Sequence, residues 1–91
     1  MSTDPENDPV LRDLRDRIAA VDSELVDGVN RRVELVRQLK EHKAAHGIEF
    51  VDRAQEERLI DRLVAESTGP VSEEGLRELY RTLLELVKRD A

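Results

Sequence analysis

The sequence is notable first for what it lacks. Its 91 residues include no cysteine, no tryptophan, and only one phenylalanine and one tyrosine. Without cysteine, the chain has neither a disulfide to brace a small fold nor a thiol nucleophile. Because aromatic side chains are so few, leucine and valine must provide most of the packing. A single chain of this size would therefore have a thin hydrophobic core.

The sequence also lacks an excess of positive charge, because its formal net charge is −6. This charge argues against nucleic acid or an anionic membrane as a general partner. No apolar run reaches the length that spans a membrane, and no signal-peptide pattern opens the chain. We therefore expect a cytoplasmic protein with neither nucleic acid nor a membrane as a partner.

Common catalytic motifs are missing as well. There is no serine with a histidine at a readable spacing, and no glycine-rich phosphate loop. His42 and His46 are spaced i, i+4, as metal ligands can be, but two ligands are too few and no third lies at a telling spacing. We expect no metal and no cofactor, so an enzyme with this sequence would work by positioning and electrostatics.

What the sequence does contain is one long amphipathic stretch from Asp8 to about His46. Asp8 followed by Pro9 predicts a helix start, and Gly47 predicts its end. Apolar residues recur every three or four positions, at Leu11, Leu14, Ile18, Val21, Leu25, Leu35 and Leu39. Such a helix would be about 55 Å long, more than the width of a compact globule of this size. We therefore expect a second copy to cover the apolar stripe in a symmetric homodimer.

Two shorter helices are predicted after this stretch, so the expected fold class is all-α, with three helices per chain. The capping-box pattern of Asp52 and Gln55 begins the second helix, and Ser72 caps the third. The expected buried residues are Leu59, Ile60, Leu63 and Val64 in the second helix, and Leu76, Leu79, Tyr80, Leu83 and either Leu86 or Val87 in the third. We expect residues 1–7 to be a disordered tail and residues 8–91 to form one helical domain.

Charged residues interrupt the apolar stripe of the long helix. Its spacing continues through Gly28 and Arg32, and eleven residues later Lys43 returns to almost the same azimuth, about 16 Å further along the axis. Together with Arg15, these cations suit a small polyanion such as a dicarboxylate. Glu56 shares the apolar face of the second helix, where an unpaired carboxylate would be costly. These residues are the candidate binding groups.

A spaced set of residues within about positions 10–65 carries a family resemblance, with a looser match in the third helix. The set comprises Leu14-Arg15-Asp16-Arg17-Ile18, Val21-Asp22, Leu25, Arg31-Arg32, Leu35, Leu39, Lys43, Asp52 and Glu56. This pattern resembles the all-helical AroQ class of chorismate mutases. The resemblance implies an intertwined homodimeric helical bundle, with the long first helices spanning both active sites. It also implies an isomerase of the shikimate pathway and aromatic amino acid biosynthesis, which rearranges chorismate to prephenate without a metal or cofactor.

The resemblance further implies roles for individual residues. Arg32, together with Arg15 from the other chain, would hold the two carboxylates of the substrate. Lys43 would lie at the ether oxygen, where negative charge develops as the C–O bond breaks. Glu56, with the Asp52 region, would recognise the ring hydroxyl.

Three positions depart from the family pattern. Many members have an arginine where this chain has Gln55, which we still expect to line the substrate site. The third helix usually offers a serine and a terminal glutamine, which by our count fall at Val87 and Ala91. Neither side chain can donate a hydrogen bond, and one such donor can be worth about 2–4 kcal/mol of transition-state stabilisation. We therefore expect a site that includes Val87 and has weakened catalysis.

These departures leave several alternatives open besides a slow enzyme. A partner enzyme of the shikimate pathway would complete or activate the site, or the substrate would be 4-amino-4-deoxychorismate, because a lost cation beside two acids suits an amine. An isochorismate pyruvate-lyase shares the fold, although Glu56 favours a mutase. The alternative outside the enzymes is a non-catalytic helical dimerisation module, in which Arg32 and Lys43 form interchain ion pairs.

Overall fold

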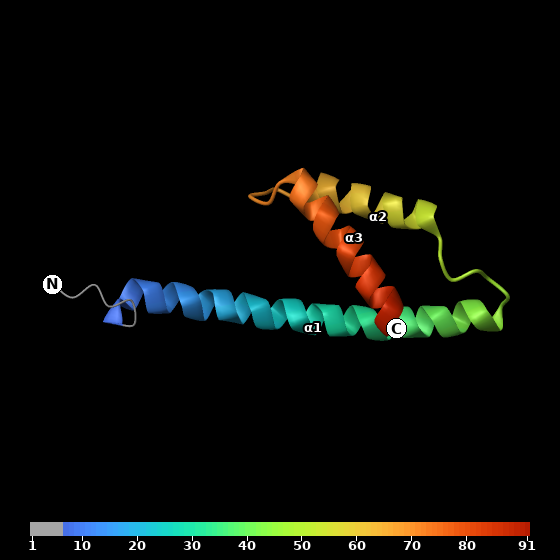
Figure 1. Cartoon of the computed structure of the whole chain (residues 1–91), viewed down its shortest axis with the longest axis horizontal. Coiled ribbons are helices and arrows are strands. Elements are labelled where there is room, and N and C mark those ends of the chain that lie inside the picture. The colour runs from blue at the N-terminus through green and yellow to red at the C-terminus, as the bar shows by residue number, and fades with distance from the viewer. Residues whose placement is uncertain (1–6) are drawn as a thin grey trace. The chain divides into compact units, whose positions relative to one another are not determined.

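The computed structural model describes residues 7–91 and contains three helices joined by short connections (Figure 1). Helix α1 comprises Pro9–Ala45, α2 comprises Arg53–Glu66 and α3 comprises Glu73–Asp90. This described part of the chain has no strand, so the predicted all-α class is confirmed. No helix in it is long and apolar enough to cross a membrane. The predicted tail, residues 1–7, lies outside the described part except for its last residue.

The residues that the sequence marks as caps set the helix boundaries. The Asp8 side chain accepts a hydrogen bond from the backbone N–H of Val10 at 2.9 Å. The Ser72 hydroxyl likewise accepts from the backbone N–H of Gly75 at 3.0 Å. Helix α1 ends just before Gly47, whose φ of 65° lies in the left-handed region that glycine adopts without steric cost. These boundaries were predictable because a cap acts within a few residues along the chain.

The capping box predicted at the start of α2 is correct only in its first half. The Asp52 side chain accepts a hydrogen bond from the backbone N–H of Gln55 at 3.0 Å. The side-chain oxygen of Gln55 accepts instead from the Arg58 guanidinium, at 3.3 Å from Nε and 3.0 Å from a terminal nitrogen. A charged donor makes the stronger hydrogen bond, so Gln55 is held by the next turn of its own helix.

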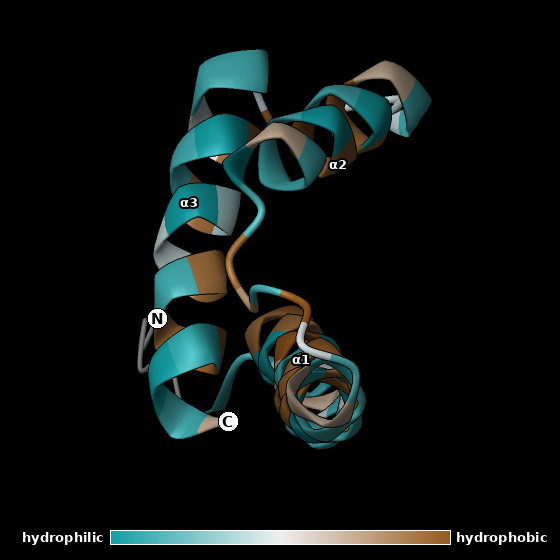
Figure 2. Ribbon diagram, turned by 90° about the vertical axis from the view of Figure 1, so that its right-hand side faces the viewer, coloured by the Kyte–Doolittle hydropathy of each residue, from teal (hydrophilic) through white to brown (hydrophobic). Residues whose placement is uncertain are grey.

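The chain divides into two compact units, and the first of them ends at Arg31. The described part of this unit is the N-terminal part of α1, a helix in which no residue is buried. In its stripe, Leu11 is partly exposed, and Leu14, Ile18, Val21 and Leu25 are 46–60% exposed. Figure 2, which looks nearly along α1, shows hydrophobic residues gathered on one side of the helix. The predicted stripe therefore exists, and it is open in a single chain.

The second unit, Arg32–Ala91, contains the buried core of the described residues. In it α2 packs against α3, and hydrophobic residues gather on the facing sides of the two helices (Figure 2). The buried side chains are Ile60 of α2, which is 1% exposed, and Leu84 and Val87 of α3, which are 6% and 0% exposed. This small set agrees with the thin core expected from the composition.

The buried face of α3 differs from the predicted one. Leu79 was expected to be buried but is 56% exposed, whereas Leu84, which was not expected, is buried. Apolar residues are so frequent in α3 that two neighbouring stripes both satisfy the helical period. Packing against α2 buries Leu84 and Val87, whereas Tyr80 and Leu83 stay partly exposed and Leu79 is exposed.

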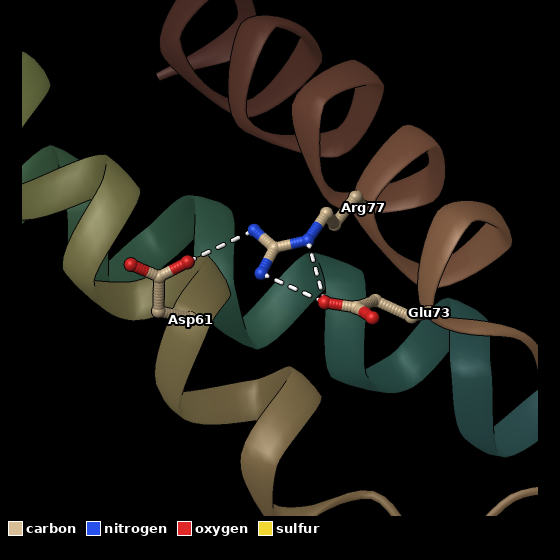
Figure 3. A network of polar contacts seen from close by, with 3 residues as sticks. All are labelled: Asp61, Glu73 and Arg77. Carbon is tan, nitrogen blue, oxygen red and sulfur yellow. Dashed lines mark hydrogen bonds and ion pairs between the residues drawn. The ribbon is translucent and has the colours of Figure 1, made fainter.

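An ion-pair network also joins α2 and α3 (Figure 3). Arg77 of α3 donates to Asp61 of α2 at 2.9 Å, and to Glu73 of its own helix at 3.2 and 3.3 Å. The hydrogen bond to Asp61, followed by that to Glu73, raises the pKa of Arg77 above its ordinary value. The guanidinium of Arg77 stays charged and contacts both helices. The network therefore restrains how α2 and α3, which carry several of the cleft residues, pack together.

Candidate active site

A cleft of about 230 Å³ lies within the second unit. Residues of α1, the following loop, α2 and α3 line it, and they are Arg32, Val36, Leu39, Lys43, Phe50, Asp52, Gln55, Glu56, Leu59, Leu84 and Lys88. Five of the seven predicted site residues are among them, namely Arg32, Lys43, Asp52, Gln55 and Glu56. The structure therefore brings these five together, and their individual roles stay predictions.

Arg32 supplies a cation without a protein partner on the α1 side of the cleft. It is half-buried, and no hydrogen bond or ion pair links its side chain to any other residue of the described chain. A guanidinium presents a planar fork of donors that matches the geometry of a carboxylate. An anion can therefore bind Arg32 without first breaking a contact within the protein.

Lys43 lies eleven residues after Arg32 on the same helix and is tied to the loop that follows it. Its Nζ donates a hydrogen bond to the backbone carbonyl oxygen of Phe50 at 3.1 Å. Because an ammonium group has three N–H donors, this contact fixes the side chain without using all of its donors. Lys43 is thus both anchored to the protein and able to donate to a ligand in the cleft.

Glu56 is paired with Lys88, a residue that sequence reasoning did not assign to the site. The Lys88 Nζ lies 2.8 Å from a carboxylate oxygen of Glu56 and 2.8 Å from one of Glu85. The side chains of Lys88 and Glu56 are 19% and 23% exposed, whereas that of Glu85 is 72% exposed. The hydrogen bond to Glu56, followed by that to Glu85, raises the pKa of Lys88. Lys88 is therefore cationic, and the penalty for an unpaired Glu56 is avoided.

Sequence reasoning did not assign Lys88 to the site because its position near the end of a helix already explains why a lysine occurs there. A lysine in the last turn of a helix interacts favourably with the helix dipole wherever its side chain points. The signal that identifies it is its position four residues after Leu84 and one after Val87, at the edge of the buried stripe. That signal can be read only once the buried stripe of α3 is known.

Two predicted site residues lie outside this cleft. Val87 is fully buried and does not line it, whereas its neighbour Lys88 does. Leu84 and Lys88 are therefore the residues of α3 that line the cleft in this single chain, and a substrate-binding role for Val87 stays a prediction. Arg15 lies exposed in the first unit, as a residue that acts on a second chain would.

The cleft is positively charged in an otherwise acidic chain. Three cations, Arg32, Lys43 and Lys88, line it together with two carboxylates, those of Asp52 and Glu56. One of the carboxylates, Asp52, is also engaged by the backbone at the start of α2. The excess of positive charge favours an anionic ligand.

Residues 7–91 contain no group of three or more side chains that could hold a metal ion. The rings of His42 and His46 lie with their centroids 4.2 Å apart, and His46 Nδ1 is 2.9 Å from the backbone carbonyl oxygen of His42. The two histidines thus contact each other at the end of α1, and no third side chain of residues 7–91 joins them as a metal ligand.

Comparison with known proteins places this geometry in a family. The sequence matches the chorismate mutase type II family over residues 14–90, a range that includes every residue lining the cleft. The structure is similar to that of a chorismate mutase (Form I) from Thermus thermophilus, with a TM-score of 0.83 and 25% sequence identity. That similarity covers 85% of this chain and 96% of the other, and no curated protein matches the sequence. Because the family match extends over most of the chain, this protein belongs to the type II, AroQ-class chorismate mutases.

Proposed function

We propose that this chain is an isomerase that rearranges chorismate to prephenate in the cleft of its second unit. One observation carries the proposal: Arg32 and Lys43 line a single cleft with Glu56, and Arg32 has no partner among the described residues. The rearrangement breaks one C–O bond and forms one C–C bond within the same molecule. It therefore needs no protein nucleophile, and the site has only to hold and polarise its substrate.

The two cations of α1 are assigned different tasks. The Arg32 guanidinium binds a substrate carboxylate, which favours the folded conformer in which the bond-forming carbons meet. The Lys43 ammonium donates a hydrogen bond to the ether oxygen, where negative charge develops as the C–O bond breaks. A fixed cation at that oxygen stabilises the transition state more than the ground state, so it accelerates the reaction.

The residues at the start of α2 complete the cleft. We assign Glu56 to accept a hydrogen bond from the ring hydroxyl of the substrate. One carboxylate oxygen of Asp52 is engaged at the helix cap, and the side-chain oxygen of Gln55 is engaged by Arg58. The remaining polar atoms, the second oxygen of Asp52 and the amide nitrogen of Gln55, are the ones that we assign to the substrate.

A second copy of the chain completes the site in this proposal, by forming an intertwined homodimer and supplying Arg15. In support, α1 is 37 residues and about 55 Å long, and none of its residues is buried. Leu35 and Leu39 of its stripe are 62% and 47% exposed, like the apolar residues of the first unit. A second copy carries the same stripe and is its natural complement. The two substrate carboxylates would then meet Arg32 of one chain and Arg15 of the other.

We also propose that residues 8–91 act as one catalytic domain, in line with the family match over residues 14–90. The departures from the family pattern at Gln55 and in the last turns of α3 still favour help from a partner enzyme of the shikimate pathway. That partner and the cytoplasmic location stay predictions from the sequence.

The direct test is the loss of ultraviolet absorbance of chorismate in the presence of the purified protein. Lys43→Ala should lower kcat about 100- to 1,000-fold, because a donor at the developing charge is lost, with the circular dichroism unchanged. Arg62→Ala is a control for the loss of a cation, because Arg62 is an exposed residue of α2 outside the cleft lining, and it should retain most of the activity. An inactive wild-type protein, or a fully active Lys43→Ala variant, would contradict the proposal.

A further inference from the structure

We propose that Lys88 and Glu56 together hydrogen-bond the ring hydroxyl of the substrate and discriminate against an amine at that position. The inference rests on the proposed function, because it names the substrate class that the same cleft accepts. It goes beyond the family pattern, which offers an uncharged serine and glutamine from the third helix. Here the third helix contributes an ammonium group instead.

Lys88 is built into the cleft and is not a loose surface side chain. Its side chain is only 19% exposed, and its Nζ lies 2.8 Å from Glu56, itself a lining residue. The last turn of α3 is also tied to α1, because the Arg37 guanidinium donates to the backbone carbonyl oxygen of Asp90 at 3.2 Å. Lys88 is therefore held both through its side chain and through the backbone of its helix.

The pair has the hydrogen-bonding groups that a hydroxyl requires. Two of the three N–H donors of Lys88 are accounted for by Glu56 and Glu85, and the third is left for a ligand. Glu56 has a second carboxylate oxygen besides the one that Lys88 contacts. A hydroxyl can donate to that oxygen and accept from Lys88 at the same time. Both polar groups of the pair are then satisfied by one substrate atom.

A protonated amine in the same place satisfies only half of the pair. It can donate to Glu56, but it has no lone pair to accept from Lys88 and brings a second positive charge against the ammonium. The sequence alone left an amine open as an alternative, because Gln55 replaces a family arginine beside two acids. Lys88 returns a cation to the cleft and neutralises one of those acids. Charge and hydrogen bonding therefore both select chorismate over 4-amino-4-deoxychorismate.

The test measures kcat/KM for chorismate and for 4-amino-4-deoxychorismate with the wild-type protein and with Lys88→Met. We expect the wild type to prefer chorismate. Methionine keeps the length of the side chain but removes its charge and donors, so kcat/KM for chorismate should fall about 10- to 100-fold. The kcat/KM for 4-amino-4-deoxychorismate should fall less, so the ratio of the two kcat/KM values should move closer to one.

Arg89→Met is the matched control. It removes a cation from the adjacent position, but Arg89 is 71% exposed, pairs with Asp90 and does not line the cleft. The net charge of the protein changes by the same amount as in Lys88→Met, so any general electrostatic effect appears in both variants. The preference for chorismate should be unchanged in Arg89→Met.

The outcomes separate this inference from the proposed function. A wild-type protein that prefers the amine substrate would overturn the inference, as would a folded Lys88→Met variant with an unchanged preference. Lys88→Arg keeps the charge and must keep the preference, so it provides a second test if the methionine variant does not fold. Failure of the proposed function would look different, because the wild-type protein would then not convert chorismate at all.

Discussion

The two units of this chain use the same apolar spacing in different ways. In the second unit, Ile60, Leu84 and Val87 are at most 6% exposed, and helices of the same chain cover them. In the first unit, apolar side chains with the same three-to-four spacing, such as Ile18 and Leu25, are 60% exposed. Equal patterns thus lead to unequal burial, because only the second unit includes neighbouring helices to pack against. In the proposed homodimer, a second copy of the chain covers the first unit.

The cations of the two units differ in a parallel way. Arg32, Lys43 and Lys88 are half-buried around a cleft, whereas Arg15 of the first unit is exposed. In the proposed homodimer, the second unit forms a site and the first unit contributes Arg15 to the site of the other copy.

The largest expected effect is on assembly, and Leu25→Asp would reveal it. A carboxylate placed on the exposed apolar stripe would be desolvated in the proposed dimer interface, so the dimer should dissociate and lose helix content. Light scattering after size exclusion should then give a mass close to the 10.4 kDa of one chain. Glu24→Gln, a change at the adjacent exposed position, should leave the dimer intact. A Leu25→Asp variant that stays dimeric would show that the stripe does not form the interface.

The next effect concerns the sharing of active sites. Arg15→Ala and Lys43→Ala should each lower kcat/KM by about 100-fold or more, because each removes a charged donor to the substrate. Refolding the two variants together should restore about a quarter of the wild-type activity, because half of the dimers are mixed and each has one intact site. A mixture as inactive as its parents would indicate that both residues act within one chain.

A smaller effect tests the core of the second unit. Ile60→Ala should lower the free energy of unfolding by about 2–5 kcal/mol, because it leaves a cavity at a position that is 1% exposed. Urea unfolding followed by circular dichroism measures this change. Val71→Ala, at a position that is 50% exposed, should change stability by no more than about 0.5 kcal/mol. Equal effects of the two changes would mean that Ile60 does not belong to the core of the folded protein.

The smallest effect is a pH dependence at the edge of the cleft. The hydrogen bond and charge of Lys88 lower the pKa of Glu85 below its ordinary value of 4.5, so this contact stabilises the folded state above that pH. The stability is lost as the pH falls through the lowered pKa. Glu85→Gln should therefore be slightly less stable than the wild type at pH 7, and the difference in urea midpoint should vanish on acidification. A difference that grows in acid would contradict the assignment.

Much of the fold could be predicted because its signals are local. Asp8, Asp52 and Ser72 each cap a helix through a hydrogen bond to a backbone N–H two or three residues away. Arg32 and Lys43 could be placed together because eleven residues of a continuous helix fix their relative azimuth. Such relations hold for a helix whatever packs against it.

The contacts between helices could not be predicted in the same way. In α3, apolar residues are dense enough for two stripes, so the helical period could not choose between Leu83 and Leu84. The family pattern counted from Tyr80 pointed to Val87, whereas Lys88 was attributed to the helix dipole alone. The pairing of Lys88 with Glu56 joins residues far apart in the sequence, and no local rule relates them.

From the amino-acid sequence alone, one could predict three helices, where they begin and end, and that two cations share one face of the longest helix. The tertiary structure alone decided which face of α3 is buried and which of its side chains enters the cleft. The physical reason is that caps and helical periodicity act within one helix, over a few residues. The choice of a buried face and of an ion-pair partner depends on how two helices pack together.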